Sequence, residues 1–290
     1  MSHKLLCLGG LLLAIGILAT LVLWLIWGNR ALTVTHLTVE GQQLPAPFSG
    51  LRIAQVSDLH NAQFGPDNQD LLDLLEAENP DLIVLTGDLV DSRRTDLEVG
   101  ISFGTRAAQI APTYFVPGNH EARLSGEDYA ALKQGLEAGG VTVLENRLAT
   151  LERDGAYITL AGVYDPGFYT DYLMRDTALV TGTLLSGLGL EEQEYTVLLS
   201  HRPELLDSYA AHPVDLVFAG HAHGGQIRLP GIGGLAAPGQ GLFPKYDAGL
   251  FTQEGTQMVV SRGLGNSIFP LRVNNRPELV MMELKASDGI

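Results

Sequence analysis

Residues 51–60 read LRIAQVSDLH, and residues 81–91 read DLIVLTGDLVD. In each stretch, a run of mostly aliphatic residues leads directly into an aspartate. A short apolar run bounded by polar or turn residues is typical of a buried strand, so strands are predicted at Leu51–Ser57 and Asp81–Thr86. Between them, Asn68–Glu78 carries leucines on one face and carboxylates on the other, which predicts a helix. This succession of strand, helix and strand is typical of an α/β domain.

The alternation of strand and helix patterns continues further along the chain. Helices are predicted over about 94–110 and 127–137, and a leading strand over Leu32–Val39. Further strands are predicted near 113–116, 141–144, 157–163, 195–200, 214–219, 225–229, 256–261 and 278–283. Because strands alternate with helices at first and later follow one another closely, the expected fold is a mixed α/β sandwich. Residues 165–192 fit no regular pattern, and a mobile or capping insertion is expected there.

Composition excludes several classes of protein. The 290 residues include 33 acidic and 18 basic side chains, a formal net charge of −15. Nucleic acids are bound mainly through clustered Lys and Arg, so no nucleic-acid partner is expected. Cys7 is the single cysteine, which excludes an intrachain disulfide framework and a cysteine-based zinc finger. A chain of this length can bury a core without such crosslinks.

An uncharged apolar stretch lies close to the N-terminus. Leu5–Trp27 holds 23 residues without a charge, and Trp24 and Trp27 stand at its far end, where indole rings favour the membrane interface. At about 1.5 Å per residue, a helix of this length crosses a hydrocarbon core of about 30 Å. The alternatives are a buried core helix and a cleaved signal peptide. Since a signal peptide has an apolar core of about 7–15 residues and a small-residue cleavage site, an uncleaved anchor is expected.

The expected organisation is a short tail and anchor at 1–30, a linker with the leading strand at 31–50, and one large domain at 51–290. Short N-terminal tails generally stay inside, so we expect a single-pass protein with its domain on the outer face of the cell membrane. Residues 31–290 hold 16 basic and 33 acidic side chains, a net charge of −17. Anionic lipid surfaces repel such a domain, so the helix is expected to hold it at the membrane. The sequence leaves the oligomeric state open.

Polar side chains follow five of the predicted strands at the point where each strand ends. They are Asp58 and His60, Asp88, Asn119 and His120, His201, and His221 and His223. Ligands of open α/β sheets collect beyond the carboxyl ends of the strands, so loops there can bring these side chains onto one centre. Carboxylates, imidazoles and one amide suit Mn²⁺, Fe, Zn²⁺ or Mg²⁺ better than a structural zinc site. Even seven of these eight side chains are too many for one ion, but two ions about 3.5–4 Å apart that share a carboxylate account for them.

Each motif on its own is weak. Asp-x-His and Gly-Asp are common in turns and helix starts, and a lone histidine such as His201 is more often a hydrogen-bonded surface residue. The Gly220–His223 motif is more specific, yet it also occurs incidentally. Five such motifs, each at a strand end, are not plausible as coincidences, so the joint pattern predicts a dinuclear metal site.

The order of these motifs resembles that of the calcineurin-like metallophosphoesterase superfamily, whose motifs are D-x-H, G-D, G-N-H-[E/D], a separate H, and G-H-x-H. The corresponding residues are Asp58–His60, Gly87–Asp88, Gly118–Glu121, His201 and Gly220–His223. The match covers roughly residues 50–285. Stretches such as GHAHGGQIRLPG and SRGLGNSIFPLRVNNRPELV resemble the membrane-associated YkuE/YaeI-type branch. The resemblance implies a calcineurin-like four-layer α-β-β-α sandwich of two mixed sheets, preceded here by one N-terminal transmembrane helix.

The resemblance also implies a role for each site residue. One divalent ion would be held by Asp58, His60, Asp88 and His223, and the other by Asp88, Asn119, His201 and His221. Manganese is the first choice of metal, with zinc, iron and magnesium as alternatives. His120 would lie over the scissile bond and stabilise the transition state or protonate the leaving oxygen. Glu121 and Asp91 are candidates for orienting the ligand imidazoles.

The expected activity is hydrolysis of a phosphodiester or phosphomonoester by metal-bound hydroxide, because bound metals lower the pKa of water. The anchor favours a lipid or envelope-related substrate. Two alternatives stay open: a pyrophosphatase acting on a lipid-linked nucleotide sugar of the UDP-diacylglucosamine type, and an inactive metal-binding scaffold. A metallo-β-lactamase-like enzyme would need an H-x-H-x-D-H cluster, which the sequence lacks.

Other features bear on the substrate. Leu229–Pro244 is rich in Gly, Pro, Leu and Ile, and it is either an apolar lip against the bilayer or an acyl chain, or an ordinary buried loop. Gly263–Asn266 is a turn whose backbone could approach a ligand. The cationic candidates for holding phosphate or a polar head group are Arg123, Arg202, Arg228, Lys245, Arg262 and Arg272.

Overall fold

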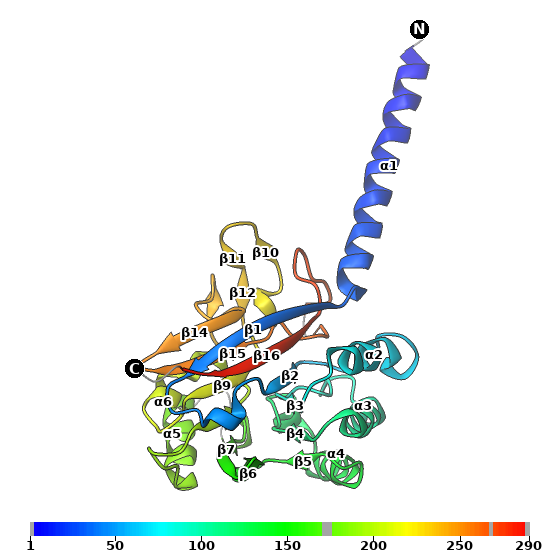
Figure 1. Ribbon diagram of the computed structural model, residues 1–290. Helices are drawn as coiled ribbons and strands as arrows, with labels where there is room; N and C mark the ends of the chain where they lie inside the picture. Colours follow the sequence, from blue (N-terminus) through cyan, green and yellow to red (C-terminus); the bar gives the residue numbers. More distant parts are fainter. Residues whose placement is uncertain (1–2, 170–175, 267–268, 288–290) are drawn as a thin grey trace.

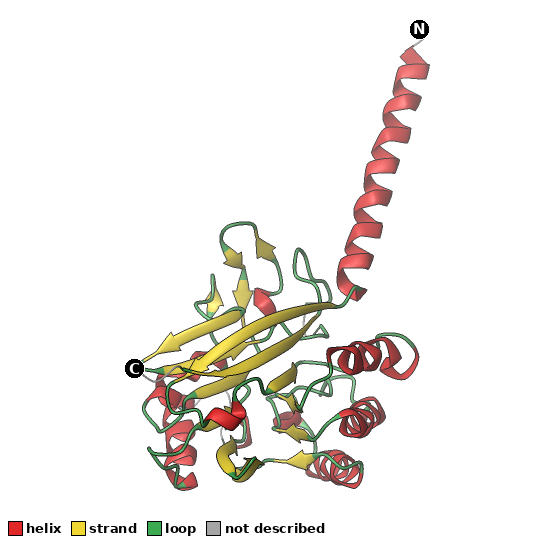
Figure 2. Cartoon of the chain, in the orientation of Figure 1, coloured by secondary structure: helices red, strands yellow, loops and turns green. Residues whose placement is uncertain are grey.

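Two six-stranded sheets pack face to face, and helices cover the outer face of each sheet (Figure 1, Figure 2). This computed structural model describes residues 3–169, 176–266 and 269–287. The architecture confirms the expected sandwich of two mixed sheets preceded by one apolar helix.

The first sheet has the strand order β1-β16-β2-β3-β4-β5. Its strands are β1 (Thr33–Gly41), β2 (Arg52–Val56), β3 (Leu82–Leu85), β4 (Thr113–Phe115), β5 (Thr142–Val143) and β16 (Glu278–Ala286). Strands β2 to β5 run parallel, whereas β16 is antiparallel to β2 and parallel to β1. The outer face is covered by α2 (Gln69–Glu78), α3 (Leu97–Ile110) and α4 (Gly126–Ala138).

The second sheet has the strand order β14-β15-β9-β8-β7-β6. Its strands are β6 (Arg147–Arg153), β7 (Ala156–Gly162), β8 (Thr196–Leu199), β9 (Leu216–Ala219), β14 (Gly249–Gln253) and β15 (Thr256–Val260). The four inner strands run parallel, and β6 and β14 pair antiparallel with them at the two edges. Helices α5 (Thr177–Leu188) and α6 (Leu206–Ala210) cover its outer face.

Short elements fill the connection between β9 and β14. They are β10 (Arg228–Leu229), β11 (Gly233–Gly234), β12 (Ala236–Ala237) and β13 (Gly241–Leu242), which form two small antiparallel pairs. The strand predicted near 225–229 is therefore reduced to two residues. Single 3₁₀ turns occur at Ala46–Phe48, Pro66–Asn68, Glu121–Arg123, Pro166–Phe168, Pro203–Leu205 and His223–Gly225.

Three apolar layers hold these elements together. The layer between α2–α4 and the first sheet contains Leu71, Phe103 and Leu132; the layer between the sheets contains Ile53, Val84 and Phe218; and the outer layer under α5 and α6 contains Leu185, Leu206 and Val217. Full burial of one such side chain stabilises the fold by about 1.5–3 kcal/mol. Because both sheets are fixed in this way, the loops at their carboxyl ends are held in constant positions.

Helix α1 (His3–Arg30) projects from this body (Figure 1). Its segment Cys7–Arg30 is long and apolar enough to cross a membrane, and the body buries none of its most apolar stretch, so it is not a core helix. Its C-terminal end is fixed to the loop before β16. Asn29 exchanges two hydrogen bonds with the backbone of Arg272, of 2.7 and 2.9 Å, and the guanidinium of Arg276 lies 4.9 Å from the ring centre of Trp27.

The structure differs from the sequence expectation within 165–192. Helix α5 lies in this segment and buries Leu185 against the second sheet. The prediction that the segment has no regular structure is therefore wrong for Thr177–Leu188. Asp176 caps the helix by accepting hydrogen bonds from two backbone N–H groups, and Gly189 ends it with a φ of 68°. Residues 170–175 lie outside the described residues, and a capping role for the segment stays a prediction.

Candidate metal centre

The predicted site residues come together at one edge of the sandwich. Asp58 and His60 follow β2, Asp88 follows β3, Asn119 and His120 follow β4, His201 follows β8, and His221 and His223 follow β9. All eight residues are at most 5% exposed. Both sheets contribute, so the cluster exists only when the two sheets are packed against each other.

The first group consists of Asp58, His60 and His223, which offer ligand atoms within 4.8 Å of one another. The Nε2 atoms of His60 and His223 face each other at 3.2 Å. Nε2 of His223 lies 3.5 Å from Oδ1 of Asp58. Two imidazole nitrogens and one carboxylate oxygen therefore converge, as three ligands of one metal ion do.

The second group consists of Asp88, His201 and His221, again with ligand atoms within 4.8 Å of one another. Nε2 of His201 lies 3.2 Å from Oδ2 of Asp88 and 3.2 Å from Oδ1 of Asn119. The same Oδ2 atom of Asp88 lies 3.5 Å from Nε2 of His60 in the first group. Asp88 thus stands between the two groups, where a carboxylate shared by two ions would be.

Two buried ring nitrogens of the cluster have no hydrogen-bond partner in the described part of the chain. They are Nδ1 of His60 and Nε2 of His221. Burial of a polar atom without a partner costs free energy, so such atoms in a native fold call for an explanation. For His221, a metal ion held together with Asp88 and His201 would supply the missing partner. The residues present therefore fit a bound metal.

The backbone of this edge is strained at five of the proposed ligands. Positive φ angles occur at Asp58 (53°), His60 (47°), Asp88 (54°), His221 (65°) and His223 (48°). Non-glycine residues rarely adopt this conformation, and each instance costs on the order of 1–3 kcal/mol. Such strain persists only where the surrounding structure enforces it, and it collects at functional sites. This observation comes from the backbone and agrees with the side-chain geometry.

Burial and neighbouring charges set the protonation of the cluster. Burial lowers the pKa of His60 and of His221 well below the usual histidine value, so both rings are neutral and offer a lone pair to a metal. Burial also disfavours a charged His201, but the Asp88 carboxylate outweighs this and raises the pKa of His201 to about 10. His201 in turn lowers the pKa of Asp88 well below its usual value, although burial acts in the opposite direction.

His120 is oriented by the loop after β3. Its Nδ1 accepts a hydrogen bond from the backbone N–H of Ser92 at 3.1 Å, and its ring packs edge-on against His60 with 4.4 Å between ring centres. Because that N–H can only donate, the neutral ring carries its proton on Nε2. Oδ1 of Asp91 lies 3.4 Å from the same Nδ1, but two acceptors cannot form a hydrogen bond, and Asp91 accepts instead from the backbone N–H of Arg93 and the guanidinium of Arg94. A role of Asp91 in orienting a ligand imidazole stays a prediction. His120 also shares a ligand-type group with His60 and Asp88.

Glu121 plays a different part from the expected one. Its fully buried carboxylate accepts hydrogen bonds from the backbone N–H groups of Asp88 (2.7 Å), Gly118 (2.8 Å) and Val90 (3.2 Å). These contacts join the loops after β3 and β4. Glu121 therefore orients backbone, and through it Asp88, rather than the imidazole of a ligand.

Gly118 is needed because the two loops approach closely. A Cβ atom at this position would lie 2.3 Å from Oδ1 of Asp88 and 2.9 Å from Cε1 of His201. Gly118→Ala is therefore expected to displace Asp88, to destabilise the fold by about 1–3 kcal/mol and to reduce metal binding. Thermal unfolding and metal content of the purified variant check this. Gly126→Ala is the control, since a Cβ there meets nothing within 4 Å, and an equal effect of both substitutions would contradict the prediction.

The cationic candidates differ in what they contact. Arg202 makes a buried two-point contact with Asp165, with Nε–Oδ2 at 2.6 Å and Nη2–Oδ1 at 3.0 Å, so it is not available to hold phosphate. Arg228 pairs with Asp247, Arg262 pairs with Glu278, Lys245 lies over the ring of Tyr246, and Arg123 lies on the turn after His120.

Arg272 reaches the metal cluster. Its Nη2 lies 3.4 Å from Nδ1 of His223, and its guanidinium also donates to the carbonyl oxygens of Arg262 and Gly265. It is 2% exposed, and burial lowers its pKa to about 10. The contact between Arg272 and His223 joins residues 49 positions apart. The spacing of the sequence motifs therefore could not predict this contact.

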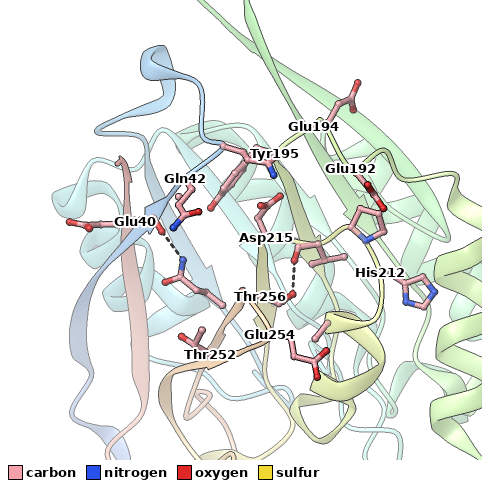
Figure 3. A pocket seen from close by; sticks show the side chains of 17 residues that line it. Glu40, Gln42, Glu192, Glu194, Tyr195, His212, Asp215, Thr252, Glu254 and Thr256 are labelled. Carbon is pink, nitrogen blue, oxygen red and sulfur yellow. Dashed lines mark hydrogen bonds between the residues drawn. The ribbon is translucent and has the colours of Figure 1, made fainter. Parts of the chain in front are cut away.

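A separate pocket of about 630 Å³ opens at the other end of the sheets (Figure 3). It lies before the first residues of β8 and β9, whereas the metal cluster follows their last residues. Its walls include Glu40, Glu192, Glu194, Asp215 and Glu254. So many carboxylates repel a phosphoester, and the pocket is not a part of the candidate site.

Comparison with known proteins agrees with this description. A profile of the family "Calcineurin-like phosphoesterase" matches residues 51–225. The uncharacterised metallophosphoesterase YkuE of Bacillus subtilis is 32% identical over 259 residues, which cover 88% of this chain and 86% of YkuE. The phosphodiesterase YaeI of Escherichia coli is 31% identical over 245 residues, 82% and 83% of the two chains. A transmembrane protein with metallophosphoesterase domain from Bos taurus is 29% identical and covers 88% of this chain and 57% of its own length.

Two mixed sheets with a buried cluster of carboxylates and imidazoles at one edge define a class of metal-dependent hydrolases. The chain belongs to the calcineurin-like phosphoesterase family. Its relatives place it in the YkuE/YaeI-type branch, and it is a metal-dependent phosphoester hydrolase.

Proposed function

We propose that this chain is a membrane-anchored, dinuclear-metal phosphoesterase that hydrolyses a phosphodiester or phosphomonoester of a lipid or another envelope component. The observation that supports it most is the position of Asp88. Its Oδ2 lies 3.5 Å from Nε2 of His60 and 3.2 Å from Nε2 of His201, between two groups of metal-type ligands. The anchor is supported by α1 and by relatives whose names include a transmembrane protein.

The proposed ligand sets are those expected from the sequence: Asp58, His60, Asp88 and His223 for one ion, and Asp88, Asn119, His201 and His221 for the other. Two divalent cations in such a site lower the pKa of water and neutralise charge on phosphoryl oxygens. Manganese is proposed first, with zinc, iron and magnesium as alternatives, since a site of carboxylate, amide and imidazole ligands without a thiolate admits each of them.

The remaining groups of the site position the substrate and the ligands. His120 presents its Nε2–H, because its Nδ1 is occupied by the N–H of Ser92, and we assign to this proton a hydrogen bond to the phosphoryl or leaving oxygen. Glu121 holds the loops of Asp88 and Gly118 in place. The domain is proposed to act on the outer face of the membrane.

The test is the activity of the full chain in detergent, stripped of metal and reloaded with Mn²⁺, Zn²⁺, Fe²⁺ or Mg²⁺. Turnover of bis-p-nitrophenyl phosphate or p-nitrophenyl phosphate is expected only after reloading, and the ratio of the two rates distinguishes a diesterase from a monoesterase. Binding of two ions without cleavage of either compound would favour the pyrophosphatase or the inactive scaffold. Folded protein that binds no metal would overturn the proposal.

A further inference from the structure

An apolar pocket of about 350 Å³ opens beside the proposed metal ligand His223. Its walls include Ile227, Leu235, Ala236, Ala237, Pro238 and Phe269, and none of the described residues lining it is an Asp, Glu, Lys or Arg. Pockets of this size and character bind the apolar part of a ligand. An apolar group bound in this pocket would therefore lie next to the place where the phosphoester would react.

Exposed apolar side chains lie on the short segments that line or adjoin this pocket. Ile232, Leu242, Phe243 and Phe269 are 67%, 71%, 59% and 48% exposed. The backbone N–H of Phe243 donates to the carbonyl of the pocket residue Leu235, so this exposed ring is attached directly to the pocket wall. Exposed apolar groups that gather around a pocket mark a surface that contacts a membrane or another apolar partner.

The charge of the same region distinguishes it from the rest of the chain. Residues 216–246 and 255–277 contain no Asp or Glu, although the chain has 33 of them. Their five cationic residues are Arg228, Lys245, Arg262, Arg272 and Arg276. Arg228 and Arg262 pair with Asp247 and Glu278 just outside these ranges, and Arg272 is buried, so this face is not strongly cationic. Anionic lipid would repel the acidic remainder of the body more strongly than this face.

The position of α1 indicates that a membrane covers the face that carries this pocket. The described residues of the loop before β16, 262–266 and 269–276, hold the end of α1 through Asn29 and Trp27, and they reach the pocket through a hydrogen bond of 2.9 Å from Gln226 to the carbonyl of Phe269. The hairpin β10–β11 projects on the side of the body from which α1 rises (Figure 1). Trp side chains at the end of a spanning helix lie at the interface, so this loop and hairpin lie near lipid.

We propose that this face rests on the leaflet from which α1 emerges, and that the pocket beside His223 binds an acyl chain of the substrate. The substrate class is then an acylated phosphoester drawn from the bilayer, with its phosphorus at the metal site. This inference rests on the proposed function and adds the part of the substrate that it leaves unassigned.

Photolabelling in nanodiscs tests the contact with lipid without any catalysis. The full chain is incorporated into nanodiscs whose bilayer consists of dioleoyl phosphatidylethanolamine and dioleoyl phosphatidylglycerol. A small fraction of phosphatidylcholine in this bilayer carries a diazirine in one acyl chain. Trypsin cleavage after Arg228 and Lys245 isolates residues 229–245. Label is expected in this fragment and in α1, which serves as the internal positive control. Label confined to α1 would overturn the proposal.

The pocket itself is tested by the preference for an acylated substrate over one without acyl chains. Wild-type protein is expected to cleave the p-nitrophenyl ester of dioctanoyl phosphatidic acid with a kcat/KM at least about tenfold above that for bis-p-nitrophenyl phosphate, the effect of about 1.4 kcal/mol of added binding. Ala236→Trp fills the pocket and is expected to remove this ratio, whereas Leu179→Trp, an exposed leucine on α5, keeps it.

The two failures can be told apart. If wild type cleaves both compounds with equal kcat/KM, the acyl pocket is wrong and the phosphoesterase stands. If metal-loaded protein cleaves neither compound, the proposed function is wrong, and labelling of residues 229–245 then decides alone whether this face meets lipid.

Discussion

Asp88→Asn is expected to lower kcat/KM for bis-p-nitrophenyl phosphate by more than about 10³-fold, or about 4 kcal/mol of transition-state stabilisation. The carboxylate stands between His60 and His201, so its charge acts on both proposed metal positions at once. Asn keeps the shape, tolerates the positive φ of 54° and can still accept the 2.7 Å hydrogen bond from the N–H of His120. The loss is therefore one of charge and not of fold.

Metal content by mass spectrometry separates this prediction from general damage. Wild-type protein is expected to retain two ions per chain, and Asp88→Asn one or none, while circular dichroism shows that the variant is folded. Asp154→Asn is a matched control, because Asp154 is an exposed aspartate with a similar φ of 50°. Full metal content in Asp88→Asn would show that Asp88 does not join the two sites.

The interior of both sheets could be predicted from the sequence, whereas two edge strands could not. The buried strands β2, β3, β8 and β9 are short apolar runs, and such runs can be recognised without knowledge of their neighbours. Strands β6 and β14 alternate between exposed and half-buried residues and have little apolar signal. The sequence marks these two strands only through the turns that join them to their neighbours, Asp154–Gly155 and Glu254–Gly255. The positive φ values of these turns are those of tight hairpins.

The clustering of the candidate metal ligands at one edge could be predicted for a related reason. Each directly follows a recognisable strand, and parallel strands present their carboxyl ends at one edge. The supporting contacts have no such local signal. Ser92 reaches His120 across 28 positions, and Arg202 reaches Asp165 across 37, so these pairs are visible only once the loops are folded. Roles that depend on such contacts, among them that of Glu121, were predicted incompletely.

His120→Ala is expected to lower kcat by about 10²–10³-fold while both metal ions stay bound, because His120 is assigned a hydrogen bond to the reacting phosphoryl group and no metal. Its Nδ1 is occupied by the N–H of Ser92 at 3.1 Å, which leaves Nε2–H as the donor toward the substrate. Removing a donor of this kind affects the transition state more than ground-state binding. We therefore expect a large change in kcat, a small change in KM and unchanged metal content.

The choice of leaving group decides between the two roles open to His120. Phenol has a pKa of about 10, so diphenyl phosphate needs protonation of its leaving oxygen far more than bis-p-nitrophenyl phosphate does. A hydrogen bond that stabilises phosphoryl charge predicts similar losses for both compounds in His120→Ala, whereas proton delivery predicts a much larger loss for diphenyl phosphate. His212→Ala, at a histidine at the far end of the sheets, should change neither rate. Loss of metal from His120→Ala would contradict the assignment and make His120 a ligand beside His60 and Asp88.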